Sequence, residues 1–203
     1  MKPFIQKSFI DLHECDIISQ YVELLDRNNR LSKVIKKNGQ YWQLNGDPLT
    51  DAVGLVYLPK IETILDKNLS LTYTMLRRWK KDCFIDWHRN KWECEVTVVL
   101  QISDNHWSIA FASNNQSGSN PVINGTQDEQ AQILTPQQGD AVIFNAAETH
   151  HGRRPLKDTA CTTLMLYYVE KNSYLDQKDN RQVYGDNYQS RLRPNGDVWK
   201  INA

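Results

Sequence analysis

The chain contains 203 residues, enough for one domain with a substantial core. Its 24 lysine and arginine residues balance 24 aspartate and glutamate residues, so no net field attracts nucleic acid or an anionic membrane. The four cysteines form no CxxC pair and stand among apolar residues, which predicts buried free thiols in a reducing compartment. No stretch approaches the roughly 20 apolar residues that cross a bilayer. We therefore expect a cytoplasmic protein without nucleic-acid or membrane partners, and the sequence carries no signal for its oligomeric state.

The first 70 residues predict two helices with a short strand between them. Asp11 can cap a helix that runs to about Arg30, because apolar residues recur there at steps of three and four. Alternating residues at 40–44 predict a strand, which ends in turn residues. A second helix, capped by Thr50, is expected to run to Asp66, and Pro59 should kink or divide it.

Beyond residue 70 the pattern changes to short strands rich in β-branched and aromatic residues. We expect strands at 71–80, 84–88, 94–103, 107–113, 132–134, 140–145 and 161–170. The polar segment 114–130 predicts a loop. Helices followed by seven or eight short strands indicate a mainly β chain, an antiparallel sandwich or jelly roll with N-terminal helices. We expect one domain over 1–203, with a helical support region (1–70), a β core (71–170) and a C-terminal extension (171–203).

Two histidine-containing segments suggest a metal site. His88 lies among polar and aromatic residues where one predicted strand ends, and the adjacent His150 and His151 follow another strand. Adjacent residues on a strand face opposite sides, so only one of the pair can point inward. Two histidines on neighbouring strands, with an oxygen ligand two residues past the first, form the facial arrangement that binds non-haem iron(II). We expect the site to exclude His13 and His106.

Four segments carry a more specific pattern: YTMLRRWKKDCFIDWHRNKWECEVTV, HWSIAF, GDAVIFNAAETHHGRRPL and LMLYYV. Together they resemble the iron(II)/2-oxoglutarate-dependent dioxygenases related to the prolyl hydroxylases, over about residues 71–170. The resemblance implies a double-stranded β-helix (a cupin-like jelly roll), with iron(II) and 2-oxoglutarate as cofactors. It implies His88 and His151 as iron ligands, and Pro155 falls where the family has a proline.

The sequence departs from the family pattern at the third metal ligand. Asn90 stands where the family has an aspartate ligand, and an amide oxygen can ligate iron(II) but adds no negative charge. Lys91 stands where the family has an arginine. We place Lys91 and Glu93 on the substrate side of the site. A cupin-like site without 2-oxoglutarate could instead use Glu93 or Glu95 as its carboxylate ligand.

The co-substrate site departs as well. Trp79 replaces a tyrosine that lies near 2-oxoglutarate in the family, and Ala160 and Cys161 replace the basic residue that grips its far carboxylate. An arginine fork suits a carboxylate, so we expect Arg153 to take this role, with Arg77 as the next candidate.

These observations favour an iron(II)-dependent oxygenase of the 2-oxoglutarate type with a variant site, which oxidises a small molecule or a peptide side chain. The alternative from another class is a non-catalytic jelly-roll module that binds a ligand or a protein. Metal content after purification without a chelator separates the binding module from the enzymes.

Overall fold

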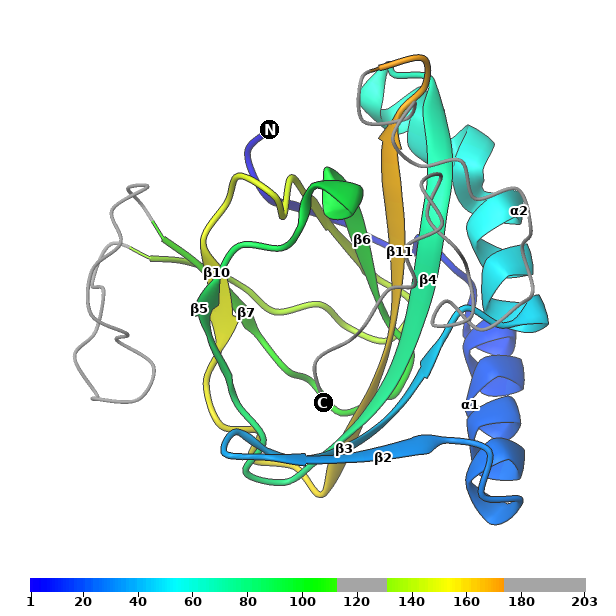
Figure 1. The fold of residues 1–203 in the computed structure, drawn as a ribbon, viewed down its shortest axis with the longest axis vertical. Coiled ribbons are helices and arrows are strands. Elements are labelled where there is room, and N and C mark those ends of the chain that lie inside the picture. The colour runs from blue at the N-terminus through cyan, green and yellow to red at the C-terminus, as the bar shows by residue number, and fades with distance from the viewer. Residues whose placement is uncertain (113–130, 174–203) are drawn as a thin grey trace, which may run out of the picture.

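The computed structural model describes residues 1–112 and 131–173 (Figure 1). The predicted loop 114–130 and nearly all of the C-terminal extension therefore lie outside the described residues. The helices are α1 (Leu12–Arg27) and α2 (Pro48–Leu65), with a 3₁₀ turn η1 (Trp92–Cys94). The strands are β1 (Phe4–Gln6), β2 (Ser32–Lys36), β3 (Gly39–Asn45), β4 (Leu69–Lys80), β5 (Ile85–His88), β6 (Val96–Gln101), β7 (Ile109–Phe111), β8 (Gln132–Leu134), β9 (Ala141–Phe144), β10 (His151–Arg153) and β11 (Ala160–Glu170).

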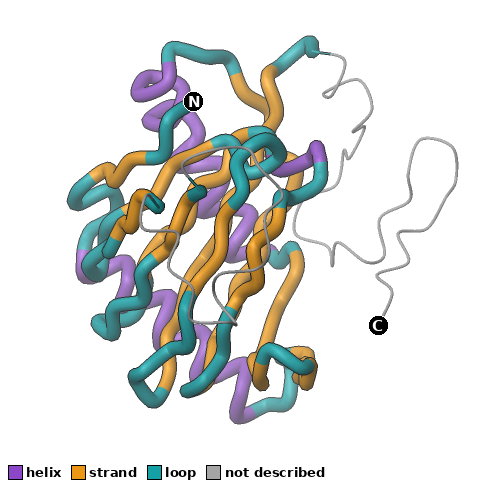
Figure 2. Tube along the Cα trace, turned by 90° about the vertical axis from the view of Figure 1, so that its left-hand side faces the viewer, coloured by secondary structure: helices purple, strands orange, loops and turns teal. Residues whose placement is uncertain are grey.

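The strands form two antiparallel sheets that face each other. The larger sheet has the order β1-β9-β6-β11-β4-β3-β2, and the smaller has the order β5-β10-β7-β8. Figure 1 shows both helices on the outer face of the larger sheet, and Figure 2, viewed from the side of the smaller sheet, shows them behind the strands. This arrangement confirms the predicted mainly β jelly roll with helices in its N-terminal part.

Helix α1 begins where the sequence predicts and ends earlier. The Asp11 side chain accepts from the Glu14 backbone N–H, and the Glu14 side chain accepts from that of Asp11, so the two form a capping box. The helix ends at Arg27 instead of Arg30. Asn28 stops it by donating its side-chain amide to the Leu24 carbonyl.

Helix α2 begins before the predicted cap. Asp47, not Thr50, caps it, because the Asp47 carboxylate accepts from two backbone N–H groups and Pro48 suits the first helical position. We predicted that Pro59 kinks or divides the helix, and division is wrong, since the helix continues to Leu65. Pro59 is exposed, so the carbonyl one turn earlier that loses its partner can face water.

The structure also contains three strands that the sequence did not predict. β1 pairs with β9, β10 lies between β5 and β7, and the mostly exposed β2 forms one edge of the larger sheet. Residues 1–70 therefore supply three strands as well as the helices. The strand predicted at 94–103 starts at Val96, because η1 occupies the preceding residues.

Side-chain alternation on β11 separates two buried layers. Leu164, Leu166 and Tyr168 pack in the cluster between the larger sheet and the helices, whereas Met165 and Tyr167 pack in the cluster between the two sheets. The inner face of β11 thus contributes to the interior of the jelly roll. The four cysteines are buried and free, as predicted. Within the described residues no helix is long and apolar enough to cross a membrane.

Candidate active site

His88 and His151 lie side by side on neighbouring strands of the smaller sheet. They are register partners in the antiparallel pairing of β5 with β10, and their ring centroids are 4.4 Å apart. Gly152 permits this close approach, because a Cβ atom there would lie 2.7 Å from the Ile85 carbonyl oxygen. At metal–nitrogen bonds of roughly 2.1 Å, rings this close can bind one ion together.

Backbone carbonyls fix the tautomer of both rings. The His88 Nδ1 lies 2.8 Å from the carbonyl oxygen of Asp86, and the His151 Nδ1 lies 2.9 Å from that of Thr149. A carbonyl oxygen only accepts, so each Nδ1 carries the proton and donates. In each ring Nε2 is therefore the nitrogen left to bind a metal, as in other histidine ligands whose second nitrogen donates to a carbonyl.

His151 is held neutral in the interior. Burial, with the nearby His88 and Arg153, lowers the pKa of His151 to about 3. The Phe144 ring packs edge-on against the imidazole at 4.8 Å and helps to fix its plane. His151 is therefore uncharged at neutral pH.

The other histidines lie apart from this pair. The Nε2 of His150 accepts a hydrogen bond from Arg89 Nε at 3.3 Å, while His13 and His106 are exposed. None of the three lines the cavity described below. Burial, followed by the charges of Arg89 and His88, lowers the pKa of His150.

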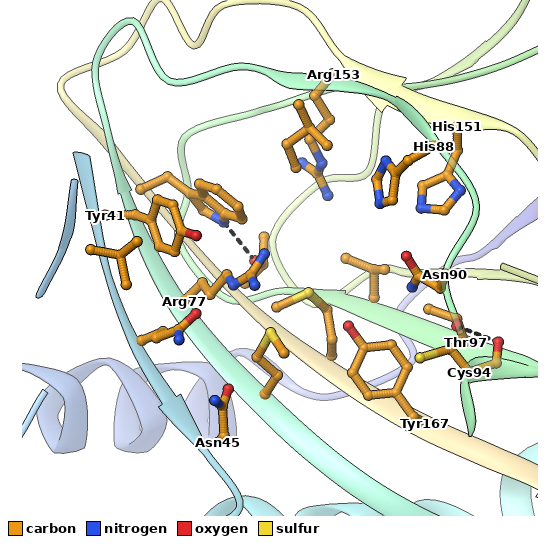
Figure 3. A pocket seen from close by; sticks show the side chains of 18 of the residues that line it. Tyr41, Asn45, Arg77, His88, Asn90, Cys94, Thr97, His151, Arg153 and Tyr167 are labelled. Carbon is orange, nitrogen blue, oxygen red and sulfur yellow. Dashed lines mark hydrogen bonds between the residues drawn. The ribbon is translucent and has the colours of Figure 1, made fainter. Parts of the chain in front are cut away.

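Asn90 lies beside the two imidazoles (Figure 3). Its backbone N–H donates to the Ala146 carbonyl at 2.8 Å, which fixes the turn after β5. No group of three histidine, cysteine or acidic side chains in the described part of the chain could hold a metal ion. The donors near the pair are thus two imidazole nitrogens and an amide, without a carboxylate.

A cavity of about 1070 Å³ opens from the histidine pair into the space between the sheets. Strands of both sheets line it, and so does the whole of β2. The turn between β2 and β3 packs against the segment that leads into β5. A Cβ on Gly39 would lie 2.6 Å from Cys83 Sγ, and Lys37 forms an ion pair with Asp86 at 3.3 Å. The hairpin β2–β3 therefore forms one wall of the cavity.

Arg153 points into the cavity close to the histidines (Figure 3). Its Nη1 donates to the Trp107 carbonyl at 2.7 Å, and its guanidinium lies over the Trp107 ring at 4.6 Å. It is only 5% exposed and forms no ion pair with any described residue. Burial lowers the pKa of Arg153 to about 10. This buried cation therefore has open capacity for an anion.

Arg77 and Trp79 line the cavity from β4 in the larger sheet. The Trp79 Nε1 donates to Thr163 Oγ1 at 3.1 Å, so the indole is fixed. The Arg77 guanidinium lies over the rings of Tyr41 and Trp79, at 5.0 and 5.1 Å from their centroids. The cavity thus has arginines on two different strands.

The remaining predicted site residues are placed differently. Lys91 is exposed and lines the cavity, whereas Glu93 is buried and Glu95 accepts from the Glu170 backbone N–H. Neither glutamate lines the cavity. Cys161 does not line it either; its thiol lies 3.4 Å from Gln101 Nε2.

Strand β3 lines the cavity, which the sequence did not predict. Tyr41, Gln43 and Asn45 alternate along this strand and all line the cavity. The alternation predicted the strand, but a polar face on a strand gives no sign of whether it meets water or a cavity.

No family model and no curated protein sequence matches the chain. Solved structures match its fold. HygX from Streptomyces hygroscopicus, solved with nickel and 2-oxoglutarate bound, gives a TM-score of 0.64 at 13% identity, over 84% of this chain and 83% of that one. A Pseudomonas putida prolyl-4-hydroxylase gives 0.61 at 13% identity, over 84% and 93%. SnoN, a non-haem α-ketoglutarate-dependent epimerase from nogalamycin biosynthesis, gives 0.64 at 10% identity, over 91% and 87%. The chain therefore has the double-stranded β-helix fold of the 2-oxoglutarate/iron(II) oxygenases.

Proposed function

We propose that the chain is an iron(II)- and 2-oxoglutarate-dependent oxygenase that oxidises a small molecule or a peptide side chain. One cavity holds two paired imidazoles and a buried guanidinium that has no counter-ion among the described residues, and this combination is the main support for the proposal. A metal and a carboxylate-bearing co-substrate would satisfy these two features together.

The donors fit a divalent metal in number and kind. His88 and His151 would supply two imidazole nitrogens, and Asn90 would supply its side-chain oxygen. Iron(II) bound there would activate dioxygen for oxidation of the substrate. With three neutral ligands the charge of the ion stays uncompensated, so we expect weaker binding than a carboxylate would give.

The chain's own residues would hold the co-substrate. Arg153 would grip the far carboxylate of 2-oxoglutarate with the N–H groups that Trp107 leaves open, and Trp79 would form a wall beside it. Lys91 would contact substrate at the cavity mouth. Glu93 and Glu95 do not line the cavity, so we assign neither of them a contact with the substrate or the metal. HygX, which shares the fold, has been solved with the small molecule hygromycin B bound.

Anaerobic calorimetric titration of 2-oxoglutarate tests this proposal. We expect wild-type protein with iron(II) or nickel(II) to bind 2-oxoglutarate, and His88→Ala to lose metal-dependent binding. His13→Ala is the matched control, because His13 is exposed and does not line the cavity. Equal binding to the wild type and to His88→Ala would contradict the proposal. Conversion of 2-oxoglutarate to succinate would then test catalysis.

In the described part of the chain no aspartate or glutamate lines the cavity beside the histidine pair, which favours one second candidate, a non-catalytic binding module. In this case the cavity would take an anionic ligand without metal. Purification without a chelator separates the two: protein free of iron that also fails to take up added iron(II) would favour the module.

A further inference from the structure

The charge of the cavity is strongly one-sided. The chain as a whole has 24 basic and 24 acidic residues. Among the described residues, no aspartate or glutamate lines the cavity, whereas these cationic residues do: Lys33, Lys36, Arg77, Arg89, Lys91 and Arg153. Low-dielectric walls concentrate the field of such a group. The far carboxylate of 2-oxoglutarate would account for one of these cations only.

Arg77 has unused hydrogen-bonding capacity. Its Nε is buried and has no hydrogen-bond partner, and it forms no ion pair with the described residues. The rings of Tyr41 and Trp79 contact the guanidinium. Stacked in this way, a guanidinium directs its N–H edge away from the rings. A buried donor without a partner costs free energy, which an acceptor on a ligand would recover.

Two amides on β3 share this corner. Gln43 is the register partner of Arg77, and Asn45 lies two residues further along the same face of the strand. The side-chain oxygens of both amides are buried without a hydrogen-bond partner. Both line the cavity, and Figure 3 shows Asn45 and Arg77 on the same wall. Three polar side chains with unmet capacity therefore lie together.

This corner is distinct from the one at Arg153. Arg77 comes from β4 of the larger sheet and Arg153 from β10 of the smaller sheet, on opposite walls in Figure 3. Each guanidinium stacks on its own indole, Arg77 on Trp79 and Arg153 on Trp107. The two indoles meet edge to face at 5.1 Å. Each guanidinium is therefore held in place by its own indole.

We propose that Arg77 binds the anionic group of the substrate that the enzyme oxidises, while the side-chain oxygens of Gln43 and Asn45 accept hydrogen bonds from hydroxyl groups next to that anion. The substrate is a small molecule with a carboxylate or a phosphate ester, and its anion occupies a different corner from the carboxylate of 2-oxoglutarate. Lys33 and Lys36 on the edge strand β2 extend the positive field to the mouth. This inference rests on the proposed function, because it assigns Arg153 to the co-substrate.

The test titrates glycerol 3-phosphate and butyrate into wild-type protein loaded with nickel(II) and 2-oxoglutarate, with glycerol as the neutral control. Tryptophan fluorescence reports binding, since Trp79 contacts Arg77. We expect one of the two anions to bind and glycerol to fail. Arg77→Met should weaken anion binding at least about tenfold and leave 2-oxoglutarate affinity within about twofold. Arg78→Met is the matched control, because Arg78 instead pairs with Glu23 at 2.8 Å.

Failure of both anions to bind the wild type at tens of millimolar overturns the inference. Equal anion affinity in the wild type and Arg77→Met also overturns it. A third contradicting result is a loss of 2-oxoglutarate affinity in Arg77→Met that equals the loss in Arg153→Met. If Arg77→Met does not fold, Gln43→Leu replaces it, and we expect its affinity for glycerol 3-phosphate, whose hydroxyls can donate to Gln43, to fall at least about threefold. If 2-oxoglutarate fails to bind the wild type, the proposed function fails. Titrating the two anions into wild-type and Arg77→Met protein without metal then tests separately whether Arg77 binds an anion.

Discussion

Replacing Arg153 by methionine should strongly weaken 2-oxoglutarate binding with little change in the stability of the unliganded protein. Burial lowers the pKa of Arg153 from 12.5 to about 10, which corresponds to a cost of roughly 3 kcal/mol for keeping the guanidinium charged inside the protein. The hydrogen bond to the Trp107 carbonyl offsets roughly 1.5–3 kcal/mol, and stacking on the indole roughly 1–2 kcal/mol. Methionine removes the cost of burying the charge together with the stabilisation from the hydrogen bond and the stacking. We therefore expect the free energy of unfolding to change by less than about 1 kcal/mol in the absence of ligand.

Arg153→Met should greatly weaken the complex with 2-oxoglutarate. Losing one partner of a buried charge pair costs roughly 2–5 kcal/mol, so 2-oxoglutarate affinity should fall at least about 30-fold. Denaturant unfolding without ligand and calorimetric titration with nickel(II) measure the two quantities. Arg154→Met is the control, since Arg154 is the exposed neighbour. Destabilisation above about 3 kcal/mol with unchanged 2-oxoglutarate affinity would refute the reasoning, because Arg153 would then be a structural residue.

Two further predictions concern the proposed metal site, and a third concerns the stability of the fold. Asn90→Asp adds a negative charge beside the histidine pair and should tighten iron(II) binding at least about tenfold by equilibrium dialysis; no change would place the third ligand elsewhere. Gly152→Ala brings a Cβ atom to 2.7 Å from the Ile85 carbonyl oxygen, so thermal unfolding should show a loss of about 1–3 kcal/mol and metal binding should weaken. Asp140→Asn weakens bonds from Lys7 and two backbone N–H groups and should cost about 1–3 kcal/mol at neutral pH. Burial raises the pKa of Asp140 but these bonds lower it more, below 3.8, so its contribution is complete above that pH and disappears as the pH falls through the lowered value.

Hydrophobic periodicity predicted most of the fold, because most strands have one face in a core. Side chains of β11 point alternately to the helix layer and to the interior of the jelly roll. The start of this strand was predicted to within one residue. β1 and β2 were missed for a physical reason. Both are short edge strands whose residues are half-buried or exposed, so neither produces an apolar alternation. The Thr50 cap was wrong because Asp47 offers a carboxylate three residues earlier, followed by a proline.

The site was predictable where local sequence determines it. His88 and His151 are strand-end residues with polar neighbours, and the structure pairs them in register. Arg153 lies two residues after His151 on the same strand, so both face the cavity. Gln43 and Asn45 come from a strand more than 40 residues before His88, and only the order of the sheet brings them to the same cavity. Sequence spacing contains no information about that pairing.

We propose that His88 and His151 bind iron(II) together in the cavity. Anaerobic equilibrium dialysis of iron(II) against the wild type, His151→Ala and His150→Ala tests it most directly. His150 is the adjacent control, because its ring bonds Arg89 and does not line the cavity. We expect one iron(II) per chain for the wild type and His150→Ala, and a loss of at least about 100-fold in affinity for His151→Ala. Equal iron(II) affinity in all three proteins would contradict it.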